Sequence, residues 1–166
     1  MLRLATTILA LTATSAFADL TMQFDEGAPK DRFTLTNAGD CALPAMQVVL
    51  DIGTAPAGLI FDVTGSGAGV QVFQPFELVA GADTLSATPK VVDGDSAVML
   101  DLRGLAPSRS VAFTIDVDDT GGGREITVNG SEISGATFRA TLDGETLTGT
   151  FDDRAAARIP LAACIS

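Results

Sequence analysis

Three aspartates stand close together at the end of a strand-like run, directly before the glycines 121–123. Asp116 and Asp118 are two residues apart, so their side chains project to the same side of a strand, and Asp119 follows at the turn. Calcium binds six to eight oxygen atoms in a flexible arrangement, and glycines let backbone carbonyls approach an ion. The sequence therefore predicts a calcium site formed by Asp116, Asp118, Asp119 and Glu132. A solvated acidic strand end is the alternative interpretation.

Histidine is absent from the chain, as are tryptophan and tyrosine. No Ser-His-Asp triad, Cys-His pair or histidine-ligated metal can therefore form, and acid–base chemistry would rest on carboxylates. Asp119-Thr120-Gly121 matches the aspartic-protease tripeptide, but those enzymes need two aspartates that share a proton, and the tripeptide occurs once. A carboxylate pair could also serve a glycosidase, although the aromatic residues that stack sugars best are missing. We therefore expect a protein that is not an enzyme, with a carboxylate-based hydrolase as the alternative.

The first 18 residues have the pattern of a secretory signal peptide. Arg3 supplies a positive charge, residues 4–11 form a short apolar run, and Ala16-Phe17-Ala18 is a cleavage site. The apolar run is too short to span a membrane, and no later stretch approaches the roughly 20 apolar residues that a spanning helix needs. We therefore expect cleavage after Ala18 and a secreted or periplasmic protein without a membrane span.

The chain is strongly acidic, with 21 acidic and 10 basic side chains and a net charge of −11. Loss of Arg3 with the signal peptide makes the net charge −12. Such a surface repels nucleic acid and anionic lipid headgroups, because both require Lys or Arg to neutralise phosphate. It attracts cations or a basic partner, although an acidic surface also serves solubility alone.

Both cysteines, Cys41 and Cys164, fall after the signal peptide. An exported chain meets an oxidising environment, so the sequence predicts one disulfide between them. The bond would close a loop of about 120 residues and stabilise the fold by about 4–5 kcal/mol in the chain-entropy model. Neither cysteine has a catalytic partner, so we expect a structural role.

Short alternating runs rich in Val, Ile, Thr, Phe and Leu, separated by Gly and Pro, predict an all-β domain over residues 19–166. The expected architecture is an antiparallel β-sandwich, jelly-roll or Ig-like. Asp143-Gly144 between two alternating runs predicts a tight hairpin, because both turn residues need positive φ. Arg154–Arg158 could form a helical turn. The predicted strands cover residues 20–24, 33–35, 47–52, 59–63, 70–73, 76–79, 90–92, 97–102, 111–117, 136–142 and 145–151.

The chain resembles small exported bacterial proteins termed aggregation factor core proteins, after a domain of sponge cell-adhesion proteoglycans. The similar segments are Phe33-Thr-Leu-Thr-Asn-Ala-Gly-Asp-Cys41, Leu59-Ile-Phe-Asp62, Val72-Phe-Gln-Pro75, 105–119, Glu132-Ile-Ser-Gly-Ala-Thr-Phe138 and Leu142-Asp-Gly-Glu-Thr-Leu147. The resemblance implies an extracellular β-sandwich used in adhesion or assembly. Sponge aggregation depends on calcium, which is compatible with the cluster of Asp116, Asp118 and Asp119.

These observations predict a secreted, non-enzymatic β-sandwich that acts in adhesion or as a binding module, with calcium as its one expected cofactor. The expected partner is an unidentified extracellular protein or glycan, or a second copy of the chain. Besides the hydrolase, a structural envelope protein without a ligand is a further alternative.

Overall fold

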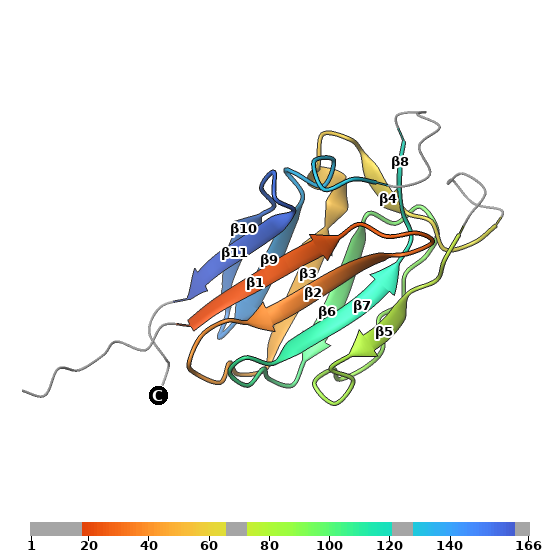
Figure 1. Cartoon of the computed structure of the whole chain (residues 1–166). Helices are drawn as coiled ribbons and strands as arrows, with labels where there is room; N and C mark the ends of the chain where they lie inside the picture. Colours follow the sequence, from red (N-terminus) through yellow and green to blue (C-terminus); the bar gives the residue numbers. More distant parts are fainter. Residues whose placement is uncertain (1–17, 66–72, 121–127, 162–166) are drawn as a thin grey trace, which may run out of the picture.

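The computed structural model describes residues 18–65, 73–120 and 128–161. They form one all-β domain in which two antiparallel sheets pack as a sandwich, as the alternating sequence predicted (Figure 1). The strand order is β11-β1-β2-β7-β5 in the five-stranded sheet, β10-β9-β3-β6 in the four-stranded sheet and β4-β8 in a separate two-stranded ribbon. The elements are β1 (Ala18–Asp25), β2 (Asp31–Asn37), β3 (Met46–Asp51), the 3-10 turn η1 (Ile52–Thr54), β4 (Leu59–Phe61), β5 (Glu77–Ala80), β6 (Ala97–Leu102), β7 (Ser110–Ile115), β8 (Val117–Asp119), β9 (Thr137–Leu142), β10 (Glu145–Thr150) and β11 (Ala156–Leu161).

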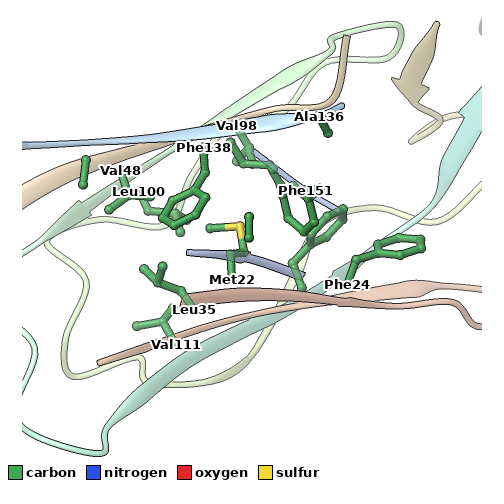
Figure 2. Packing of buried hydrophobic residues seen from close by; sticks show 14 of the residues in the cluster. Met22, Phe24, Leu35, Val48, Val98, Leu100, Val111, Ala136, Phe138 and Phe151 are labelled. Atoms are coloured by element: carbon green, nitrogen blue, oxygen red, sulfur yellow. The ribbon is translucent and has the colours of Figure 1, made fainter. Parts of the chain in front are cut away.

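The core lies between the two large sheets and is built from the inward half of each alternating strand. Figure 2 shows Met22 and Leu35 from the five-stranded sheet opposite Leu100 and Phe138 from the four-stranded sheet. Six phenylalanines are fully buried, so these rings belong to the core. Each such ring stabilises the fold by about 1.5–3 kcal/mol through the apolar area that it removes from water. Their residue numbers are Phe24, Phe33, Phe61, Phe113, Phe138 and Phe151.

The hairpin between β9 and β10 has the predicted turn. Asp143 and Gly144 adopt φ values of 50° and 81°, and Leu142 pairs with Glu145 across them. These left-handed conformations match the twist of the flanking strands, and aspartate and glycine tolerate them best. The Asp-Gly pair therefore sets the register in which Leu142 and Phe138 face the core.

Two sequence predictions are wrong, and both concern short segments. Residues 90–92 form no strand, and Val92 is 66% exposed, because two valines without a following alternating residue do not make a buried face. No helical turn forms at Arg154–Arg158, because strand β11 begins within this segment, at Ala156. Ala157, Ile159 and Leu161 of β11 all face the core. Of the strand predicted at 70–73, residues 70–72 lie outside the described residues.

The turn that carries Cys41 is fixed by a buried asparagine at the end of β2. The side-chain amide of Asn37 donates to the carbonyls of Cys41 at 2.7 Å and Leu105 at 2.9 Å, and its oxygen accepts from the Gly39 amide at 3.0 Å. Strands β2 and β11 both pair antiparallel with β1, so both end beside the start of β1. Cys164 itself lies outside the described residues, and the disulfide stays a prediction.

Residues 1–17 of the expected signal peptide also lie outside the described residues. Within residues 18–65, 73–120 and 128–161, there is no helix of the length and hydropathy that a membrane crossing requires.

Candidate functional site

The β4–β8 ribbon lies at one end of the sandwich, where the chain leaves β7 (Figure 1). Ile60 pairs with Asp118 in this ribbon, and the same register continues one step further, because the amide of Asp62 donates to the carbonyl of Asp116 at 3.1 Å. Residues directly opposite each other share a face of an antiparallel pair, and so do residues two apart on one strand. Asp62, Asp116 and Asp118 therefore lie on one face of the ribbon.

The other two residues of the predicted calcium site are placed differently. Asp119 follows Asp118 in β8 and so lies on the opposite face of the ribbon, which it shares with Val117. The amide of Asp119 donates to Oδ1 of Asp118 at 2.9 Å. Glu132 belongs to the connection before β9, where its carboxylate accepts from the Asn129 amide at 2.7 Å. Of the four predicted ligands, the ribbon face brings together Asp116 and Asp118.

Asp62 is a site residue that the sequence analysis did not single out. Its side chain is 2% exposed, and its Oδ1 atom has no hydrogen-bond partner among the described residues. Burial raises the pKa of Asp62, and a side-chain hydrogen bond with Asp93 and the charges of Asp93 and Asp118 raise it further. The one signal in the sequence is a charged residue inside the otherwise apolar run 59–63.

Asp93 holds the neighbouring turn against the end of β4. Its Oδ1 accepts from the amides of Val63 and Thr64, both at 3.0 Å. The turn is fixed further by backbone bonds, since Gly94 donates to the carbonyl of Phe61 at 2.9 Å. Asp93 thus holds the residue that follows Asp62, Val63, from a segment that lies 30 residues further along the chain.

Asp31 approaches the ribbon from the start of β2. It is 2% exposed, and its two oxygens accept from the amides of Gly27 and Val117, each at 3.1 Å. Burial raises the pKa of Asp31 to about 7, the two amides act in the opposite direction, and the charge of Glu26 adds to the rise. Asp31 therefore ties the start of β2 to the start of β8.

Asp116 lies in the middle of this group of carboxyl groups. Burial raises the pKa of Asp116 to about 7, and the charges of its neighbours Asp31, Asp62 and Asp118 contribute to the rise. The charges that raise the pKa of Asp116 thus come from other carboxyl groups. We call Asp31, Asp62, Asp93, Asp116 and Asp118 the aspartate cluster. Carboxyl groups gathered in this way raise one another's affinity for protons and attract cations.

The aspartate cluster does not have the arrangement of a closed metal site. Among the residues that the structure describes, no three carboxylate or cysteine side chains are arranged as ligands of one ion. The cluster is a group of neighbouring carboxyl groups at the end of two strands, and the predicted calcium site stays a prediction.

An open groove of about 580 Å³ lies elsewhere, along β1, β10 and β11. Asp152 is the one carboxylate among its lining residues, and Oδ1 of Asp152 accepts from the amides of Arg154 and Ala156. Glycoside hydrolysis by acid–base chemistry needs two carboxyl groups that face each other across the substrate. The groove lacks the second one. Its lining residues are Thr21, Met22, Gln23, Thr150, Asp152, Ala156, Ala157 and Arg158.

No protein-family model matches the sequence, and no curated protein is significantly similar to it. Among solved structures, a family GH18 chitinase from Chromobacterium violaceum is similar to this chain, with 18% sequence identity and a TM-score of 0.36. The alignment covers 90% of this chain and 20% of the chitinase chain, so the chain spans about one fifth of that protein. A similarity of this extent identifies neither a family nor an activity.

Proposed function

We propose that the chain is an exported, non-enzymatic β-sandwich that acts in adhesion or as a binding module, and that its binding depends on calcium. The observation that carries this proposal is the aspartate cluster, which concentrates carboxyl groups, two of them with a pKa raised to about 7, at one end of the sandwich. Such a group attracts a cation or a basic group of a partner. The resemblance to aggregation factor core proteins supports the same function.

An assay of adhesion tests the proposal. Beads coated with the purified protein are mixed in calcium and in chelator, alone and with envelope polysaccharide or envelope protein. We expect calcium to promote clumping of the beads or their retention on the envelope material, and chelator to reverse it. Beads that neither clump nor bind in either condition would contradict an adhesive function.

A carboxylate-based hydrolase is the second candidate, because carboxyl groups with strongly raised pKa values also occur in acid–base catalysts. Asp31 and Asp116 have this property. Both oxygens of Asp31, however, accept backbone amides, and its side chain is 2% exposed, so a substrate cannot reach it. A screen of glycan and peptide substrates separates the two functions: turnover that Asp116→Asn abolishes would favour the hydrolase.

A further inference from the structure

The buried oxygen of Asp62 needs a positively charged or proton-donating partner. A carboxylate oxygen that is removed from water without a hydrogen bond costs several kcal/mol, and native structures contain few such atoms. Oδ1 of Asp62 is in this position among the described residues, although the carboxyl group as a whole is 2% exposed. It belongs to the ribbon face that also carries Asp116 and Asp118. An ion bound on this face would satisfy it.

We propose that Asp62, Asp116 and Asp118 bind one divalent cation on this face, with calcium as the cation that suits them best. This inference rests on the calcium dependence proposed above and names the residues responsible. It replaces Asp119 and Glu132 of the sequence prediction with Asp62. The two strands thus contribute to one site, with Asp62 from the end of β4 and the other two from the β8 segment.

The spacing of the three side chains fits a calcium ion after small rotations. Directly opposite residues in an antiparallel pair have Cβ atoms about 5 Å apart, and residues two apart on a strand are separated by about 7 Å. Calcium–oxygen distances are about 2.3–2.6 Å, so three carboxylates with these origins can reach one ion. Among the described residues no three carboxylates are already arranged as ligands of one ion, so the ion would have to draw these side chains together.

The chemistry of the face favours calcium over other metals. Its ligands are hard carboxylate oxygens, which select calcium or magnesium rather than a soft transition metal. Asp116 and Asp118 are half-buried, so water can complete the coordination. Magnesium demands a near-ideal octahedral geometry, whereas calcium accepts six to eight oxygens in an irregular one.

The remaining carboxyl groups of the cluster act around the ion rather than on it. Both carboxylate oxygens of Asp31 accept hydrogen bonds from backbone amides. Oδ1 of Asp93 accepts hydrogen bonds from two further backbone amides. Asp93 is therefore a positioning residue, because through its two amide partners it holds Val63 and Thr64, the residues that directly follow Asp62. Asp119 lies on the other face of the same strand, which makes it a matched control.

Calorimetric titration tests the site with CaCl₂ as the probe. The chelator-treated full chain is titrated in phosphate-free buffer at pH 8, and its melting temperature is measured with and without calcium. We expect one ion per chain and a higher melting temperature in calcium. Asp62→Asn and Asp118→Asn should each weaken binding by about tenfold or more, because each removes a charged ligand. Asp119→Asn changes the net charge equally and should bind as the wild type does.

Two results would overturn the proposal. One is a folded wild-type protein that gives neither binding heat nor a melting shift at millimolar calcium. The other is an Asp119→Asn variant that loses as much affinity as Asp118→Asn, since diffuse attraction by negative charge predicts that outcome. Circular dichroism shows whether each variant is folded. If Asp62→Asn does not fold, the calcium affinity of Asp118→Asn compared with that of Asp119→Asn tests the site by itself. Calcium binding without adhesion would contradict the proposed function and leave the site standing. Calcium-dependent adhesion that Asp62→Asn and Asp118→Asn leave unchanged would contradict the site and leave the proposed function standing.

Discussion

Asp116 is surrounded by carboxyl groups, and this environment makes the stability of the protein depend on pH. Its pKa of about 7 in the folded protein lies above the ordinary value of 3.8. Between these two values the folded state therefore binds more protons than the unfolded state. Stability should be highest near pH 4 and should fall as the pH rises to about 7, with Asp31 contributing in the same sense. Asp62 and Asp118 face Asp116, and Glu26 faces Asp31, so all of these charges oppose ionisation.

Asp116→Asn should therefore stabilise the protein at pH 8 in chelator. The asparagine removes a charge that its neighbours repel, and the gain should be about 1–2 kcal/mol after allowance for the solvent that reaches this half-buried group. Urea unfolding at pH 8 and at pH 4 measures the effect, which should vanish at the lower pH. Asp119→Asn is the control and should change stability little. If Asp116→Asn destabilises the protein at pH 8 in chelator, the conclusion that neighbouring carboxylates repel the charge of Asp116 is wrong.

Asn37 is a second residue whose side chain decides local structure. Three hydrogen bonds join its buried amide group to the turn that carries Cys41 and to Leu105. Asn37→Ala leaves these backbone groups without partners, so we expect a loss of about 2–3 kcal/mol in the free energy of unfolding. Asn129→Ala, which removes an asparagine from a solvent-accessible turn, should cost less than about 1 kcal/mol. If the two variants lose the same free energy of unfolding, the burial of Asn37 does not add to the strength of its hydrogen bonds.

At the scale of elements, a glycine allows β10 to approach both β9 and β11. A Cβ atom at Gly149 would stand 2.5 Å from the ring of Phe138 and 2.9 Å from the carbonyl oxygen of Arg158. Gly149→Ala should therefore force the strands apart and destabilise the protein by about 1–3 kcal/mol. Thr148→Ala changes the exposed neighbour and should have little effect on the melting temperature. A Gly149→Ala variant as stable as Thr148→Ala would mean that β10 can shift without loss.

The sequence predicted those strands whose apolar residues alternate over six or more positions, such as 97–102 and 111–117. Strand β11 was missed because its first positions are alanines, which carry little β-propensity, and because Pro160 follows. Pro160 is tolerated since β11 is an edge strand. The pairing of β4 with β8 could not be read from the chain, because register between distant strands is set by tertiary packing. The sequence therefore predicted that Asp116 and Asp118 share a face of their strand. It could not predict that Asp62 lies on the same face of the ribbon.

At the scale of the whole molecule, the aspartate cluster and the predicted disulfide belong to opposite ends of β2. Asp31 begins this strand, and the turn that carries Cys41 follows its other end, about 20 Å away at the rise of an extended strand. The ends of β2 and β11 lie together beside the start of β1, and Cys41 and Cys164 follow these two ends in the sequence. Binding and covalent stabilisation would thus be separated in space.

This separation predicts that loss of the disulfide lowers stability without changing calcium affinity. Cys41→Ser/Cys164→Ser should lose about 2–5 kcal/mol, because the unfolded chain regains the freedom of a loop of about 120 residues. Changes this far apart with no shared partners act independently, so calorimetry should return the wild-type calcium affinity. Thiol titration of the unfolded wild-type chain without reductant should find no free thiol. Detection of two free thiols would contradict the disulfide. A calcium affinity that falls with the double substitution would contradict the independence of calcium binding from the disulfide.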